Sequence, residues 1–108
     1  MRRVKYNNVK TVIDGIKFDS KKEAKRYTEL QLLAHQNLIS DLRLQVPFVL
    51  APSVVIGGRK KPAIRYIADF VYYDKGKQVI EDVKGVLTDV FRIKRHLMMV
   101  QGNEIREV

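Results

Sequence analysis

Residues 66–85 read YIADFVYYDKGKQVIEDVKG and have the pattern of two β-strands joined by a tight turn. The first part, Tyr66–Tyr73, is rich in aromatic and β-branched residues, which favour strands. Asp74–Lys77 (DKGK) has the composition of a turn, and Gln78–Val83 resumes the strand pattern. We therefore expect a β-hairpin at the centre of a mixed sheet, with the rest of the chain organised around it.

Two acidic residues of this hairpin are expected on its inward face. Side chains alternate across a strand, so Asp69 shares a face with Ile67 and Val71. On the second strand Asp82 is followed on the same face by Lys84. Because burying a lone carboxylate is costly, inward acids are usually paired, hydrogen-bonded or bound to a metal. The pattern indicates an active site, and its structural alternative is a buried ion-pair network.

The order of these residues resembles a known family of enzymes. Asp69 on one strand and Asp82-Val83-Lys84 on the next are similar to the acid and acid-x-Lys signature of the PD-(D/E)XK nucleases, with Ala68 in place of the usual proline. The segment Phe18–Tyr27 (FDSKKEAKRY) resembles their first helix, in which Glu23 would be a further acid. Size and element order are similar to those of the small phage-type and archaeal-type members, the Holliday junction resolvases.

The resemblance implies an α/β fold with a restriction-endonuclease-like core, in which two helices flank a mixed central β-sheet. Asp69 and Asp82 can hold Mg²⁺, a hard cation that prefers oxygen ligands, and Mn²⁺ would substitute for it. The resemblance adds the carbonyl of Val83 as a ligand, and it gives Glu23 a place in a second metal site or in orienting metal-bound water. Lys84 would orient or deprotonate the attacking water, or stabilise the transition state. The implied reaction is hydrolysis of DNA to 5′-phosphate and 3′-hydroxyl ends.

A first helix is expected to begin at Ser20, which forms a Ser-x-x-Glu capping box with Glu23. On this helix Glu23 falls in the same arc as Tyr27 and Leu30, within the apolar stripe. Two interpretations of Glu23 stay open. It is a capping carboxylate that folds back to the backbone, or it is an inward acid beside the strand acids.

The composition restricts the classes of protein to which the chain can belong. The chain has 108 residues, enough for one domain, and it contains no cysteine, which fits a cytosolic location without disulfides. No apolar run approaches the roughly 20 residues needed to span a bilayer, and residues 1–10 lack the apolar segment of a secretory signal. Its 21 Lys and Arg against 12 Asp and Glu give a net charge of +9, which favours nucleic acid as partner.

The basic residues gather in a few segments. Residues 1–10 form a basic N-terminal arm or a frayed terminus. Residues 51–65 form a flexible basic loop that contacts phosphates, or else a solvated hairpin tip. Lys94 either extends past the core to solvent or reaches a phosphate near the site. The candidate DNA contacts are Arg2, Arg3, Lys21, Lys22, Arg59, Lys60, Lys61, Arg65, Lys94 and Arg95.

Further strands complete the expected sheet. Thr11–Phe18, with Asp14-Gly15 in its middle, predicts a tight hairpin. Leu44–Leu50 predicts a strand that Pro47 places at an edge or at a bulge. Gln45 in this strand lies on the outer face or forms a hydrogen bond near the site. Asn103–Val108 would be a final strand.

A second helix is expected to run from the cap Thr88-Asp89 to about Gln101, with Gly102 as its stop. Its apolar residues recur at helical spacing and would form the face packed on the core. These residues are Val90, Ile93, Leu97 and Val100, extended by Phe91 and Met98. Weaker site candidates are Asp74 in the turn, Glu81 facing away from Asp82, Asp89 at the helix start, and the surface residues His35 and His96.

Together these features predict a Mg²⁺-dependent endodeoxyribonuclease that cleaves branched DNA as a homodimer, because paired incisions suit two-fold symmetry. Three alternatives remain: a nicking or restriction-like nuclease, a nuclease subunit of a larger recombination complex, and a basic DNA-binding module without catalysis. Cleavage of a four-way junction compared with a linear duplex separates the first two from a resolvase. Binding without cleavage would identify the third.

Overall fold

A computed structural model describes residues 10–83 and 87–108, so Arg2, Arg3 and Lys84 lie outside the described residues. The chain is of the α/β class, with a mixed central sheet and two helices. The sheet has the order β3-β6-β7-β8, in which β8 alone is parallel to its neighbour. Its strands are β3 (Ser40–Ala51), β6 (Ile64–Asp74), β7 (Lys77–Asp82) and β8 (Ile105–Glu107). The helices are α1 (Lys21–His35) and α2 (Asp89–Val100).

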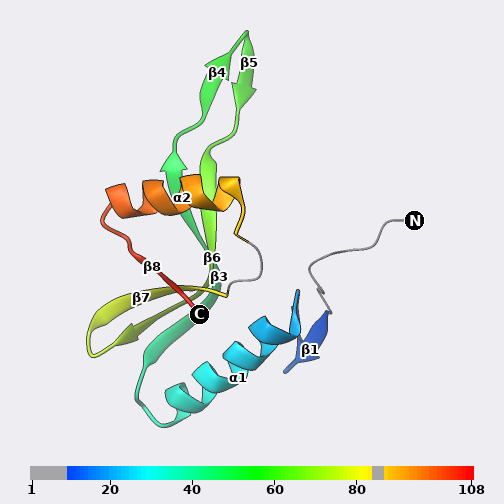
Figure 1. Cartoon of the computed structure of the whole chain (residues 1–108), viewed down its shortest axis with the longest axis vertical. Helices are drawn as coiled ribbons and strands as arrows, with labels where there is room; N and C mark the ends of the chain where they lie inside the picture. The colour runs from blue at the N-terminus through cyan, green and yellow to red at the C-terminus, as the bar shows by residue number, and fades with distance from the viewer. Residues whose placement is uncertain (1–9, 84–86) are drawn as a thin grey trace.

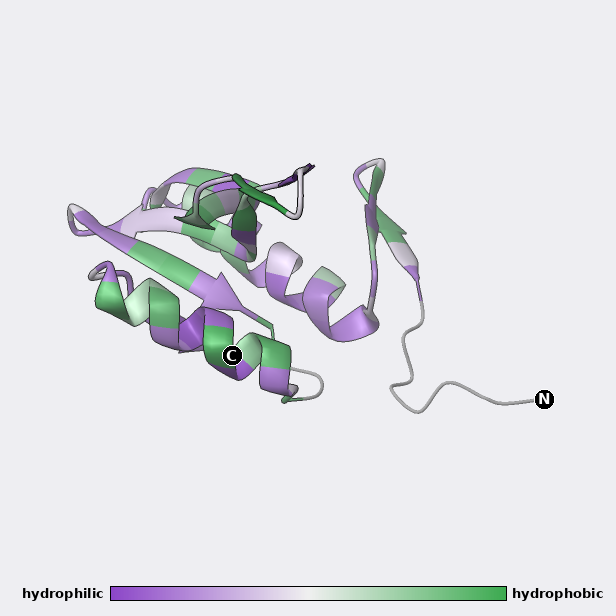
Figure 2. Ribbon diagram, turned by 90° about the horizontal axis from the view of Figure 1, so that it is seen from above, coloured by the Kyte–Doolittle hydropathy of each residue, from purple (hydrophilic) through white to green (hydrophobic). Residues whose placement is uncertain are grey.

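The two helices cover opposite faces of this sheet (Figures 1 and 2). On one face Tyr27 and Leu30 of α1 pack with Phe70 and Tyr72 of β6. On the other face Met98 of α2 belongs to a second buried cluster, which joins it to Tyr66, Ala68, Val71, Ile80 and Ile105. The sheet therefore separates two hydrophobic cores, and each core depends on one helix.

The central hairpin is confirmed. Asp74 pairs with Lys77, and the two residues between them, Lys75 and Gly76, both have positive φ, at 53° and 80°. Two consecutive left-handed residues are the geometry of a tight turn whose twist matches the flanking strands. The DKGK sequence supplies a glycine at one of these two positions, which explains why the strands reverse here.

The predicted alternation fails at Asp69. Ile67 and Val71 do not share a face, since Ile67 is 41% exposed while Val71 is buried against α2. Along β3, Leu44 packs on the α1 side and Val46 on the α2 side, although they are two residues apart. Gln45 between them has φ 54°, in the left-handed region. This residue interrupts the regular strand geometry beside Asp69, and the strand pair changes faces there.

The predicted core face of α2 is wrong for its four main residues and confirmed for Phe91 and Met98, which were expected to extend it. Val90, Ile93 and Val100 are exposed, at 61%, 60% and 72%, and Leu97 is half-buried. The helix instead packs on the sheet through Met98 and Phe91, on a different arc of the same helix. Both arcs are apolar, so helical periodicity alone did not decide between them. The bounds are as expected, with Thr88 Oγ1 accepting from the N–H of Phe91.

The predicted flexible loop 51–65 is a β-hairpin that projects from one end of the sheet (Figure 1). Its strands are β4 (Val54–Ile56) and β5 (Arg59–Lys61), joined at Gly57-Gly58. Each cross-strand pair joins one branched aliphatic residue to one cation: Val54 to Lys61, Val55 to Lys60 and Ile56 to Arg59. All six side chains are exposed. We call residues 54–61 the basic arm.

The remaining elements agree with the sequence. β1 (Thr11–Ile13) and β2 (Ile16–Phe18) form the predicted N-terminal hairpin, which packs against α1 rather than on the edge of the main sheet. Pro47 lies in β3 at the edge of the sheet, one of the two positions that the sequence predicted for it. The final strand β8 forms inside the predicted segment.

Candidate active site

Three predicted acids come from three different elements and meet at one end of β7. Glu23 lies in the first turn of α1, Asp69 lies in β6 where the strand pair changes faces, and Asp82 is the last residue of β7. The side chain of Glu23 contacts that of Asp69. Asp69 and Asp82 are both close enough to Tyr66 for their charges to raise its pKa. The fold thus places Glu23 beside Asp69, and it places both Asp69 and Asp82 near Tyr66.

Glu23 combines the two roles that the sequence left open. Its N–H donates to Ser20 Oγ at 3.1 Å, which confirms the helix cap. Its carboxylate accepts from Gln45 Nε2 at 3.1 Å and from the backbone of Asp19. Burial, and then the negative charges of Asp69 and Asp19, together raise the pKa of Glu23 to about 7. Gln45 therefore points to the site, which is the less expected of its two predicted positions.

Asp69 and Asp82 are each tied to a neighbouring strand. The N–H of Val83 donates to Asp69 Oδ2 at 2.8 Å, so the end of β7 is held against β6 by the predicted acid itself. Tyr66 Oη donates to Asp82 Oδ1 at 2.8 Å within the α2-side core. Burial, and then the charge of Asp82, raise the pKa of Tyr66 above its ordinary value, so the phenol keeps its proton and remains a donor.

The donor set suits a hard cation, although it does not form a complete cage. Carboxylate oxygens are the ligands that Mg²⁺ prefers, and Mg²⁺ usually keeps several waters, so one or two carboxylates suffice for binding. Among residues 10–83 and 87–108, no three acidic or histidine side chains stand in a group that could hold an ion. The described acids that could take part in holding an ion are Glu23 and Asp69, which contact each other. The predicted ligand role of the Val83 carbonyl stays a prediction.

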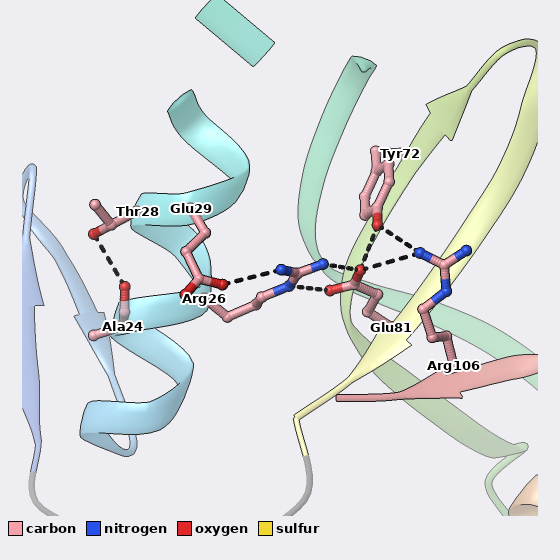
Figure 3. Close-up of polar contacts among 7 residues, drawn as sticks. All are labelled: Ala24, Arg26, Thr28, Glu29, Tyr72, Glu81 and Arg106. Atoms are coloured by element: carbon pink, nitrogen blue, oxygen red, sulfur yellow. Dashed lines mark hydrogen bonds and ion pairs between the residues drawn. The ribbon is translucent and has the colours of Figure 1, made fainter. Parts of the chain in front are cut away.

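A second acidic site was missed by the sequence. Glu81 has no exposed surface, and both of its oxygens accept from Arg26 of α1, at 2.8 Å from Nε and 2.6 Å from Nη2 (Figure 3). Tyr72 Oη also donates to Glu81 Oε2, and Arg106 of β8 lies 3.8 Å from the same oxygen. The signal in the sequence is that Glu81 is an acid between two strand residues of the buried hairpin. Strand alternation predicts that Glu81 lies on the face away from Asp82.

This second site is a closed ion-pair network. Arg26 pairs with Glu81 and also donates to Glu29 at 3.0 Å, and these contacts raise the pKa of the guanidinium. Burial and the hydrogen bond to Glu81 raise the pKa of Tyr72 to about 12. A carboxylate that accepts from an arginine fork and a phenol has its charge compensated. Glu81 therefore ties α1 to the sheet, and we assign it no place in chemistry.

The predicted DNA contacts fall into separate groups. Lys21 and Lys22 are exposed on the first turn of α1, close to Glu23 in the sequence. Lys22, Lys25 and Arg26 line a hollow of about 190 Å³ with Val83, next to the acids. The basic arm, residues 54–61, contributes Arg59, Lys60 and Lys61, and Arg65 follows at the start of β6.

The two candidate DNA contacts on α2, Lys94 and Arg95, are less available to a nucleic acid. Arg95 donates to Glu107 at 2.9 Å and lies over the ring of Phe91, so its guanidinium is already engaged. Lys94 is half-buried beside it on the helix. Arg95 thus bridges α2 to β8, and the half-burial of Lys94 limits its exposed surface. We therefore expect them to contribute less to a nucleic-acid surface than the arm and α1.

Fold and site together define an α/β protein with a carboxylate cluster at the edge of a basic surface. The chain belongs to the family described as "Protein of unknown function (DUF1064)", whose model matches residues 3–108. No match was found among curated proteins or among solved structures. Neither helix in the described part of the chain has the length and hydropathy required of a membrane span.

Proposed function

We propose that this protein is a metal-dependent endodeoxyribonuclease with a restriction-endonuclease-like core. The observation that supports this proposal most directly is the contact between Glu23 of α1 and Asp69 of β6, with Asp82 of β7 held by Tyr66 near Asp69. Like charges at such a site repel one another, and a divalent cation would offset the repulsion. Strong positive charge elsewhere on the chain makes a polyanion the natural substrate.

In this proposal each described residue has a defined task. Glu23 and Asp69 hold the cation, and Gln45 orients Glu23 through its hydrogen bond. Asp82 is fixed by Tyr66, which limits the positions that its carboxylate can take. When bound, Mg²⁺ would lower the pKa of a water ligand and neutralise charge on the scissile phosphate. Lys84 keeps the role that the family resemblance gives it, in orienting or deprotonating the attacking water or in stabilising the transition state.

The substrate in this proposal is branched DNA, and the acting species is a homodimer. The support is the position of the positive charge. Lys21, Lys22 and Lys25 are exposed on the first turns of α1, on either side of Glu23 in the sequence, whereas the basic arm projects from one end of the sheet (Figure 1). A phosphate backbone that reaches both regions would extend beyond a single scissile bond. Contacts of this kind position nucleic acid without reading its sequence, which suits recognition by shape.

The test compares a labelled four-way junction with a linear duplex of the same arms, in Mg²⁺ or EDTA. We expect paired nicks in the junction that require Mg²⁺ or Mn²⁺, and their loss in Asp82→Ala and Asp69→Asn while DNA binding persists. Asp74→Asn, a change of the same charge in the β6–β7 turn, is the control and should cleave normally. Equal cleavage of both DNAs would keep the nuclease and remove the junction specificity.

One observation favours a second candidate, a DNA-binding module without catalysis. Asp69 and Asp82 both accept hydrogen bonds from within the fold, from Val83 and Tyr66, and therefore also serve as structural ties between strands. If the site were purely structural, these hydrogen bonds would explain why Asp69 and Asp82 occur at these positions. Junction binding without cleavage, in Mg²⁺ and in Mn²⁺ alike, would identify the protein as a DNA-binding module without catalysis.

A further inference from the structure

The outer side of α2 carries an apolar stripe that no other element of the described chain covers. Val90, Ile93 and Val100 are each at least 60% exposed, and Leu97 between them is half-buried. We call these four residues the α2 stripe. Figure 2 shows α2 at one margin of the molecule, with the sheet on its inner side. A contiguous exposed apolar surface of this kind usually marks an interaction site.

The spacing of the stripe is symmetric. Its members are separated by three, four and three residues, so the pattern is the same when it is read from either end of the helix. In an antiparallel pair of such helices Val90 of one copy lies opposite Val100 of the other, and Ile93 lies opposite Leu97. Residues at three and four positions apart share one helix face, so all of these contacts form at once.

We infer that the α2 stripe is the surface through which two copies of this chain associate, antiparallel and about a two-fold axis. A two-fold interface uses the same patch on both copies, which is what a palindromic stripe provides. A twelve-residue helix is about 18 Å long, so the contact is small compared with the ~800 Å² per partner of a standard interface. We therefore expect a reversible dimer whose population depends on concentration.

Charge gives the dimer a characteristic response to salt. Each copy carries a net charge of +9, so two copies repel each other while their stripes attract. Added salt screens this repulsion and leaves the apolar contact in place. Dimerisation should therefore strengthen between 50 mM and 500 mM NaCl, opposite to the trend expected for DNA binding, where salt weakens affinity.

The helix that carries the stripe also contacts the acidic site, through its opposite, core-facing arc. Phe91, in the first turn of α2, packs against Tyr66 with ring centroids 6.4 Å apart, and Tyr66 holds Asp82. The N-terminal end of each helix therefore lies close to its own site, and an antiparallel pair places the two sites at opposite ends. That the two sites nick paired strands rests on the proposed nuclease function, whereas self-association itself does not.

The absence of cysteine makes the pairing directly testable. We would prepare Val90→Cys and Val100→Cys separately, mix them, oxidise, and identify cross-linked products by mass. The inferred pairing predicts a disulfide between the two different variants and none within either variant alone. In the antiparallel pair two copies of position 90 are about 15 Å apart along the helix axes, beyond the roughly 7 Å reach of a disulfide. Cross-linking of either variant with itself, or no cross-link in the mixture, would overturn the inference.

A second measurement follows the dimer in solution without cross-linking. Sedimentation over a range of concentrations should show at least tenfold weaker dimerisation for Ile93→Asp, with circular dichroism confirming that the fold is kept. Leu32→Asp on α1 is the matched control, because Leu32 is 58% exposed and lies on the other helix. A wild-type chain that stays monomeric at every concentration, or an Ile93→Asp change that lowers only DNA affinity, would refute the α2 dimer. A dimer that cleaves no DNA would refute the nuclease and leave the dimer standing.

Discussion

Glu81 depends on its neighbours more than any other described acid, because its carboxylate has no exposed surface. Arg26 supplies two of its hydrogen bonds, and Tyr72 supplies a third (Figure 3). Taking such a charge out of water is costly, and the cost is offset only while its partners are present. The stability of the contact between α1 and the sheet therefore depends on one side chain of the helix.

Replacement of Arg26 by methionine should destabilise the protein by about 3–5 kcal/mol, the usual cost of leaving one partner of a buried ion pair alone. Urea unfolding followed by circular dichroism measures this change. Arg43→Met is the control, because Arg43 forms an exposed pair with Asp41 and should leave stability unchanged. A loss for Arg26→Met no larger than that of the control would mean that solvent reaches Glu81.

Glu23 should give the unfolding free energy a distinct dependence on pH. Its pKa is raised from 4.5 to about 7 in the folded state, so folding favours the protonated form. In EDTA, stability should be greatest below about pH 4.5 with respect to this group and should fall as the pH rises through 7, by at most about 3 kcal/mol. Glu23→Gln should remove this slope. An unchanged slope in that variant would assign the pH dependence to another group.

At the level of elements, the basic arm has an unusual composition for a hairpin, with an aliphatic residue opposite each cation. Because the hairpin extends from the sheet, its charges are displaced from the acids and do not neutralise them (Figure 1). The arm is a natural second point of contact for a polyanion whose first contact is at α1.

Replacement of Arg59, Lys60 and Lys61 by serine should weaken DNA binding and make it less sensitive to salt. Each lost phosphate contact reduces the slope of log K against log [salt] by about 0.9 on duplex DNA, so three contacts account for about 2.7. Fluorescence anisotropy at several NaCl concentrations gives this slope. Lys75→Ser with Lys77→Ser, in the turn between β6 and β7, is the control and should preserve it. An unaltered slope in the arm variant would exclude the arm from the DNA interface.

The elements also show how far the sequence could predict the fold. Turn and cap chemistry is local, so the DKGK turn, the Ser20 cap and the Thr88 cap were all predicted correctly. The choice between the two apolar arcs of α2 is not local, because it depends on which arc meets the sheet. The change of faces at Gln45 was hidden for a related reason. In the sequence, the alternation of Leu and Val continues without a break through Gln45. The left-handed backbone at Gln45 nevertheless changes the face of the sheet on which the following residues lie.

At the scale of the whole molecule, an ion bound only by the folded chain would stabilise it by mass action. Mg²⁺ at about 100 times its dissociation constant should add about 2.7 kcal/mol to the unfolding free energy, and EDTA should reverse this. Thermal unfolding with and without Mg²⁺ measures the effect. Asp69→Asn should abolish it, and Asp74→Asn should not. Equal stabilisation of both variants would indicate ion binding elsewhere.

The candidate site could be predicted because its members are marked by chemistry rather than by position. Acids among apolar strand residues require compensation wherever they lie, so Asp69 and Asp82 were recognisable without the fold. Glu81 meets the same criterion and is more deeply buried, yet it belongs to a structural network. What separates the two cases is the arginine from α1, and no sequence pattern joins Arg26 to Glu81 across 55 positions.

The left-handed backbone at Gln45 also concerns the alignment of the family. A β-branched residue is strongly disfavoured in this conformation, whereas glycine, asparagine and unbranched polar residues tolerate it better. Members of the DUF1064 family that keep the change of faces should therefore avoid valine, isoleucine and threonine at this column, although the flanking strand favours them. An alignment guided only by strand propensity would place a gap or a shift here, and the register of Asp69 relative to β3 would then be lost.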